Sequence, residues 1–238
     1  MLLHQGRSYH CWQLDHGSRV ARVRRADLAY YTAPCDTTLV TPAAGCAAAA
    51  SYANAQGAQL APARVTTRVH GFTKRMRRSG VVFDFVQLQL PSTAFDTVAA
   101  WVRVPDCVRD HLPGAGDLDG GLHAAGHALA NVLPLFVTCA PTDVATECGG
   151  SEEHRARPMR LLVYDQLAGG CGIAASAHSQ FPALLQAAQE LVERCPCTSP
   201  VGCIACVQSF TCCAYNAVLN KQAALACLRA ARAEFLSA

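Results

Sequence analysis

Five cysteines fall within the 18 residues from Cys195 to Cys212, and their spacing constrains the fold more than any other feature of the sequence. The first four read C-x-C, a gap of five residues, and C-x-x-C. A C-x-x-C turn offers two sulfurs from one loop, and zinc takes four such ligands at tetrahedral corners, each about 2.3 Å away. We therefore predict that Cys195, Cys197, Cys203 and Cys206 bind zinc. Cys212 is an alternative ligand, because spacing alone does not exclude it.

This zinc site is expected to be structural. Four cysteine ligands leave no open position for water, and a segment this short buries too little apolar surface to hold its shape alone. Gly202 eases a tight backbone just before Cys203. Two other interpretations stay open: incidental thiols in a cysteine-rich chain, and a redox pair formed by Cys203 and Cys206.

The compartment expected for this chain is reducing and intracellular. Met1 is followed within three residues by His4, with no long apolar run, and no later segment has the roughly 18 consecutive apolar residues of a membrane span. In such a compartment the 14 cysteines are metal ligands or buried thiols rather than disulfides. We expect no membrane partner.

The patterning of the 238 residues predicts an α+β fold with a β-rich half, residues 1–112, before a mixed α/β zinc-binding domain, residues 113–238. Alternation and turn signals predict strands over 8–14, 20–24, 65–72 and 81–90. The Ala-rich residues 43–63 indicate a loop or insertion. Glycines at 114–121 mark the boundary. After it we expect helices over 122–133, from 181 and from a cap at Asn220, and a strand over 160–164.

Four cations lie between the two predicted strands of the central hairpin: Lys74, Arg75, Arg77 and Arg78. Such a group suits contact with a nucleic-acid backbone. It equally suits a solvated hairpin tip. The net charge of +3 is a weak balance, which favours a function without nucleic-acid contact.

His123 and His127 share a helix face at a spacing that metal ligands use, but the glutamate of a catalytic H-E-x-x-H motif is absent. We interpret them as packing or hydrogen-bonding histidines.

Residues 169–172 (GGCG) follow a predicted strand and precede a helix. They lack the lysine of a phosphate-binding loop, so we expect a tight turn rather than a nucleotide site.

Several of these segments together resemble the MrfA-like zinc-binding domain and the β-rich region before it, at the C-terminal end of superfamily-2 DEAD/DEAH-box DNA helicases. The resemblance rests on residues 3–9, 27–32, 121–136 (GLHAAGHALANVLPLF), 162–170, 195–212 and 216–224. It covers almost the whole chain apart from the Ala-rich segment.

The resemblance implies ATP-dependent 3′-to-5′ unwinding and a role in DNA repair for the family, and zinc ligation by Cys195, Cys197, Cys203 and Cys206. Cys212 matches a further cysteine found in part of the family. This chain departs from the pattern at Gly126, where relatives usually carry an acidic residue. It also has no Walker A loop and no Asp-Glu-x-His box, so we expect no ATP site and no catalysis by this chain alone.

Three functions follow as hypotheses. The first is a C-terminal zinc-binding module of a DNA-repair helicase that binds single-stranded or forked DNA, with the motor supplied elsewhere. The second is a zinc-stabilised protein-interaction scaffold without nucleic-acid contact. The third is a zinc hydrolase that uses His123 and His127, which predicts a second bound metal.

Overall fold

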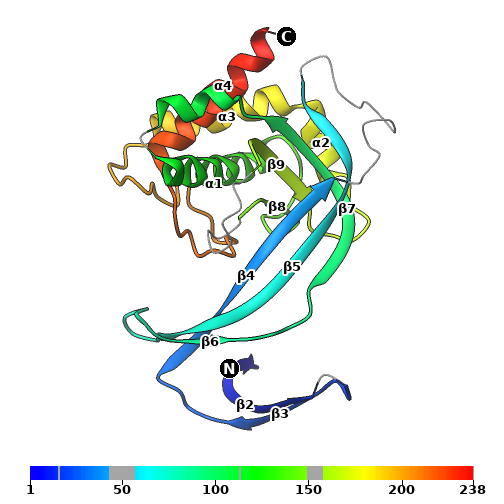
Figure 1. Ribbon diagram of the computed structural model, residues 1–238, viewed down its shortest axis with the longest axis vertical. Coiled ribbons are helices and arrows are strands. Elements are labelled where there is room, and N and C mark those ends of the chain that lie inside the picture. Colours follow the sequence, from blue (N-terminus) through cyan, green and yellow to red (C-terminus); the bar gives the residue numbers. More distant parts are fainter. Residues whose placement is uncertain (16, 43–56, 113, 149–157, 238) are drawn as a thin grey trace. The chain divides into compact units, whose positions relative to one another are not determined.

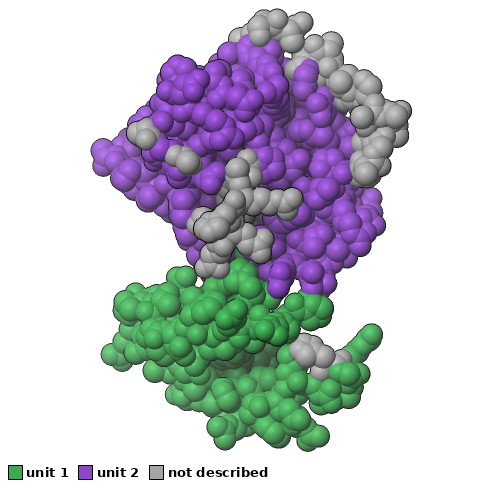
Figure 2. Space-filling model, in the orientation of Figure 1, with its two compact units in different colours: residues 1–36, 69–91 green, residues 37–68, 92–238 purple. Residues whose placement is uncertain are grey.

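The computed structural model describes residues 1–15, 17–42, 57–112, 114–148 and 158–237, and within them the chain forms two compact units (Figure 2). Unit 1 comprises residues 1–36 and 69–91, and unit 2 comprises residues 37–68 and 92–238. The expected division into residues 1–112 and 113–238 stays a prediction.

Unit 1 consists of strands and turns. β1 (Leu2–His4), β2 (Arg7–Asp15) and β3 (Val20–Arg25) form an antiparallel sheet in that order. Gln5 and Gly6 both have positive φ, as a two-residue hairpin turn requires. β6 (Val82–Gln87) pairs antiparallel with the last part of β5 (Gln59–Met76). The two hairpins predicted from alternation are therefore confirmed.

A second sheet has six described strands in the order β4-β5-β7-β9-β8, with β6 paired to β5 off this path (Figure 1). The further strands are β4 (Tyr30–Pro42), β7 (Thr93–Arg103), β8 (Val144–Thr146) and β9 (Arg160–Asp165). β5 already begins at Gln59, so the end of the segment expected to be a loop is a strand. Residues 43–56 of that expectation lie outside the described residues.

Among the described residues the helices all follow residue 105, as the composition predicted, and the α+β class is confirmed. They are η1 (Asp106–His111), α1 (Ala115–Val132), η2 (Leu133–Leu135), α2 (Ile173–Ser179), α3 (Phe181–Arg194) and α4 (Lys221–Ser237). α1, α3 and α4 pack on one another, and α1 also packs on β9 (Figure 1). Among the described helices, none is both long and apolar enough to cross a membrane.

Local sequence explains where these helices lie. Phe181, Leu184 and Leu185 face the core on one stripe of α3, and Pro182 stands in its first turn. Asn220 caps α4 as expected, because its Oδ1 accepts a hydrogen bond from the Ala223 amide at 3.0 Å.

α1 begins earlier than predicted, since its glycines are not a boundary. They allow a close approach to α4: a Cβ on Gly121 would lie 2.6 Å from that of Ala223.

Candidate metal centres and a basic surface

Four cysteines converge after the end of α3. Their Sγ atoms all lie within 4.8 Å of one another, and they belong to Cys195, Cys197, Cys203 and Cys206. Three of the Sγ–Sγ distances are 3.6, 3.7 and 3.8 Å. Four sulfurs placed about 2.3 Å from one zinc at tetrahedral angles would be about 3.8 Å apart. The chemistry and spacing of the donors therefore fit zinc without rearrangement.

Local backbone geometry places two of these sulfurs. Gly202 has φ +68°, and a Cβ there would lie 2.2 Å from Cγ2 of Val207, so only glycine fits. The turn that follows points the Cys203 amide at Sγ of Cys206, 3.2 Å away. An N–H group donated to sulfur stabilises the thiolate form, which is the form that binds metal.

Lys221 supplies positive charge to the four-cysteine cluster. Its Nζ donates to the carbonyl oxygens of Cys195 and Cys197 at 3.0 and 2.9 Å, and lies 3.3 Å from Sγ of Cys197. Four thiolates around one Zn²⁺ would carry a net charge of −2. A lysine held against the ligands offsets part of that charge.

The cysteines differ in how readily they ionise. The pKa of Cys195 falls to about 7, mainly because the Cys197 backbone N–H donates to its sulfur. Burial raises the pKa of Cys206 to about 12. A buried thiol of this kind ionises at neutral pH only when a cation compensates the charge, which is what a bound metal supplies.

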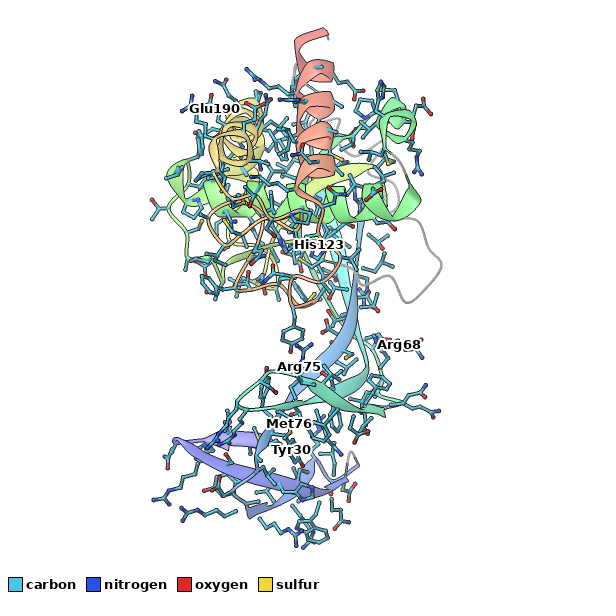
Figure 3. The ribbon with its side chains drawn as sticks, turned by 90° about the vertical axis from the view of Figure 1, so that its left-hand side faces the viewer. Tyr30, Arg68, Arg75, Met76, His123 and Glu190 are labelled. Carbon is cyan, nitrogen blue, oxygen red and sulfur yellow. The ribbon has the colours of Figure 1, made fainter. Side chains whose placement is uncertain are left out.

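A second group of metal-binding side chains lies against α1. It comprises His123, His127, Cys148 and Cys212, all buried, and their ligand atoms also lie within 4.8 Å of one another. Nε2 of His127 is 3.3 Å from Sγ of Cys148, and Nε2 of His123 is 3.4 Å from Sγ of Cys212. His123 is labelled among the helices in Figure 3. The structure thus groups Cys212 with two histidines rather than with the four cysteines.

Sequence reasoning missed the second group. The histidines do make hydrogen bonds, as expected, but Cys148 and Cys212 lie in different loops, and Cys212 is 89 residues from His123. The four-residue spacing of the histidines was the available signal. Hydrogen bonding from Cys148 holds the pKa of Cys212 far below its ordinary range. That same bond, a hydrogen bond with Cys213 and burial raise the pKa of Cys148.

Gly126, which lies between the two histidines, leaves no space for a side chain. A Cβ there would lie 2.5 Å from Oγ1 of Thr146 on β8. An acidic side chain at this position would collide with β8.

The loop over residues 169–172 is a tight turn, as predicted, and its amides are already occupied. The buried carboxylate of Asp165 accepts hydrogen bonds from the backbone N–H groups of Cys171, Gly172 and Ala174 at 2.7 to 2.9 Å. A phosphate would have to displace this carboxylate.

The four cations proposed for nucleic-acid contact lie in unit 1, on β5 and the turn after it. Nζ of Lys74 pairs with Asp84 at 2.7 Å, and Arg77 donates to Oγ of Ser8 at 2.6 Å. Arg77 and Arg78 are exposed, and Arg75 is half-buried. Arg75 is labelled in Figure 3. These side chains are presented from a paired β-hairpin.

Positive charge is concentrated in unit 1. This unit holds nine of the 20 Lys and Arg residues but only four of the 17 Asp and Glu residues, which gives it a formal charge of +5. The remaining 11 cations and 13 acidic residues give unit 2 a charge of −2. The weak net charge of the whole chain therefore conceals a strong difference between its units.

Unit 1 also exposes aromatic side chains. Trp12 on β2 is 57% exposed, and Phe83 and Phe85 on β6 are 51% and 48% exposed. Phe85 lies over Gly71 of the paired strand, where any Cβ would meet its ring at 2.6 Å. Exposed rings among arginines are typical of surfaces on which bases stack.

Comparison with known proteins agrees with this architecture. Residues 125–207 match the family described as MZB, the MrfA Zn-binding domain. All four residues of the Cys195–Cys206 cluster lie inside the matched range, whereas His123 and Cys212 lie outside it.

The chain is related to ATP-dependent helicases. It is 26% identical to the ATP-dependent helicase HRQ1 of Saccharomyces cerevisiae, over 94% of this chain and 21% of that protein. It is also 26% identical to the ATP-dependent helicase hrq1 of Schizosaccharomyces pombe, over 87% and 20%. The crystal structure of the DUF1998 helicase MrfA bound to DNA matches 96% of this chain and 29% of that one, with a TM-score of 0.59 and 23% identity. The chain thus spans about a fifth of the length of these two curated relatives.

Proposed function

We propose that this chain is the C-terminal module of a DNA-repair helicase, in which a zinc-stabilised domain supports a β-rich unit that binds DNA. The observation that carries the proposal is the segregation of charge, +5 in unit 1 against −2 in unit 2, together with exposed rings on the basic unit. The relatedness to helicases supports it, and so does the matched MrfA helicase, whose crystal structure is that of the protein bound to DNA.

The substrate that suits this surface is single-stranded or forked DNA. Exposed aromatic side chains stack on unpaired bases, which a duplex does not present, and arginines neutralise the backbone. Because the sequence lacks a Walker A loop, the ATPase motor would be contributed by another segment or subunit. A module that acts on DNA would work inside the cell.

Zinc would have a structural role in this module. Cys195, Cys197, Cys203 and Cys206 would hold the ion and thereby fix the start of α4 against the end of α3. The ion supplies a cross-link and a counter-charge for the thiolates. All four ligands would come from the protein, so water has no place on the metal.

The test is the salt dependence of binding to a fluorescent single-stranded oligonucleotide, followed by anisotropy. Arg75, Arg77 and Arg78 are changed together to Gln. The control changes three exposed arginines of unit 2, Arg103, Arg109 and Arg194, to Gln. Each phosphate contact contributes about 0.7 to the slope of log K against log salt on single strands, so the first variant should lose about 2 from that slope.

The control variant should keep the wild-type slope. Absence of binding at low salt, or equal losses in both variants, would remove DNA binding from the functions of this chain.

A protein-interaction scaffold is the second candidate. Unit 1 exposes apolar side chains, among them Leu3 at 64% and Val81 at 58%, which also suit a protein partner such as a helicase motor. The scaffold predicts no DNA affinity in the same titration, so one experiment separates the two functions.

A further inference from the structure

We infer that His123, His127, Cys148 and Cys212 form a second structural zinc site, separate from the four-cysteine cluster. The site unites two loops with α1. His123 and His127 come from successive turns of α1, Cys148 follows β8, and Cys212 lies in the segment before α4. Nothing in the relatedness to helicases assigns a metal to these four residues, and two of them lie outside the matched zinc-binding domain.

The ligand atoms already have the separations of a zinc centre. Zinc–nitrogen bonds of about 2.0 Å and zinc–sulfur bonds of about 2.3 Å place neighbouring ligands about 3.3 to 3.8 Å apart in a tetrahedron. The two nitrogen–sulfur distances are 3.3 and 3.4 Å. The rings of His123 and His127 cross at 65° with centroids 4.4 Å apart, which is compatible with both Nε2 atoms facing one point.

The surroundings orient the ligands as metal-binding residues are usually oriented. Nδ1 of His127 lies 2.8 Å from the Val207 carbonyl, which can only accept, so this contact places the proton on Nδ1 and leaves the lone pair of Nε2 on the side of Cys148. Sγ of Cys212 accepts the Asn216 amide at 3.2 Å. The Cys203 amide makes the same contact with Cys206 in the four-cysteine cluster.

Charge favours a divalent ion here. Two thiolates and two neutral imidazoles around Zn²⁺ are electrically neutral, which suits a group whose histidines are 1% exposed and whose cysteines are 7% to 8% exposed. Two sulfur and two nitrogen donors at tetrahedral distances select zinc rather than magnesium or calcium, which prefer oxygen.

The site would be closed, which separates it from a hydrolase that uses the same histidines. Four protein ligands leave no coordination position for water or substrate. Its effect would be to fix the ends of two loops on α1, and Val207, whose carbonyl orients His127, follows directly after the zinc-binding candidate Cys206. Two ions would then cross-link the segment from 195 to 212 at both ends.

The experiment counts zinc by native mass spectrometry on the full chain and on three variants. Wild type should carry two zinc ions. Cys212→Ser should carry one, as should the double variant Cys203→Ser with Cys206→Ser. Cys107→Ser is the control, because Cys107 is an exposed thiol that belongs to neither group of metal-binding side chains. It should keep both ions.

X-ray absorption at the zinc edge of the wild-type chain keeps the inference testable if a variant fails to fold. Two sites together give an average of three sulfurs and one imidazole nitrogen per zinc, whereas the four-cysteine site alone gives four sulfurs. One zinc in the wild-type chain, or a first shell of sulfur only, would overturn the second site. Neither measurement involves DNA. A negative result would therefore overturn the second zinc site without affecting the proposed binding of DNA.

Discussion

Lys221 is the residue whose role in the four-cysteine site can be tested most directly. Its ammonium group is the only cation that contacts these ligands among the described residues, and it lies 3.3 Å from Sγ of Cys197. Lys221→Met keeps the length of the side chain and removes the charge. Because partners around the ligands typically contribute 10- to 100-fold to metal affinity, zinc affinity should fall by about that factor.

Each variant competes with a chelator for zinc, and the zinc that the protein retains is measured at each chelator concentration. Arg229→Met is the control, since Arg229 lies on the same helix but pairs with Glu193 at 2.9 Å. If both variants retained zinc equally, Lys221 would have no effect on the site beyond capping two carbonyls.

The four-cysteine cluster could be predicted from the sequence because its residues are close along the chain. C-x-C and C-x-x-C fix pairs of sulfurs through local turns, and 8 to 9 residues separate the partners of the longer contacts. The second cluster could not be predicted in this way. Its contact between Cys212 and His123 depends on the packing of a loop against α1, which no local pattern specifies.

At the level of the elements, hydrophobic periodicity predicted the hairpins, the buried strand at β9 and the apolar stripe of α3. The prediction of α1 failed because a glycine-rich segment is compatible with either a linker or a closely packed helix. The glycines at 116, 120 and 121 resemble a linker, yet they lie within α1. Glycine weakens a helix, but it also lets another helix approach closely, and the second effect determines the structure here.

Two glycines of α1 therefore give opposite predictions. Gly121→Ala would place a Cβ 2.6 Å from that of Ala223 on α4, and should lower the free energy of unfolding by about 1–3 kcal/mol. Gly116→Ala meets no atom within 4 Å and should raise it by about 0.5–1 kcal/mol. Urea unfolding followed by circular dichroism measures both. A stable Gly121→Ala variant would mean that α1 and α4 are not in close contact.

A substitution on β6 allows the contribution of base stacking to DNA binding to be measured separately from that of charge. Phe85→Leu removes an exposed ring that Gly71 accommodates, and should weaken single-strand binding by about 1–3 kcal/mol if one base stacks there. The slope of log K against log salt should not change, because no cation is lost. Phe210→Leu is the control, since Phe210 is 93% exposed but lies in unit 2. Equal binding by both variants would exclude Phe85 as a stacking platform.

On the scale of the whole molecule, the distribution of charge is more informative than its sum. A net charge of +3 favoured the protein-interaction scaffold when only the sequence was considered. The division into units could not be read from the sequence, because unit 1 is assembled from two segments, residues 1–36 and 69–91. Once these segments are combined, the basic unit becomes evident.

Asp84 tests whether this distribution matters for binding. Its carboxylate pairs with Lys74 at 2.7 Å, so Asp84→Asn releases one cation and raises the charge of unit 1. Single-strand affinity at low salt should rise about two- to fivefold, the range of an exposed charge interaction, and the gain should disappear at high salt. Anisotropy titrations at several salt concentrations measure it.

Asp96→Asn is the matched control, because Asp96 pairs with Arg64 at 3.1 Å in unit 2 and equally adds one positive charge to the chain. It should leave affinity unchanged if unit 1 binds DNA. The hydrogen bond from Lys74 lowers the pKa of Asp84, so the carboxylate stays charged until the pH falls below its usual range near 4. The difference between the two variants should therefore be the same at pH 5 and pH 7. Equal gains in both variants would mean that DNA responds only to the total charge and that unit 1 is not its binding surface.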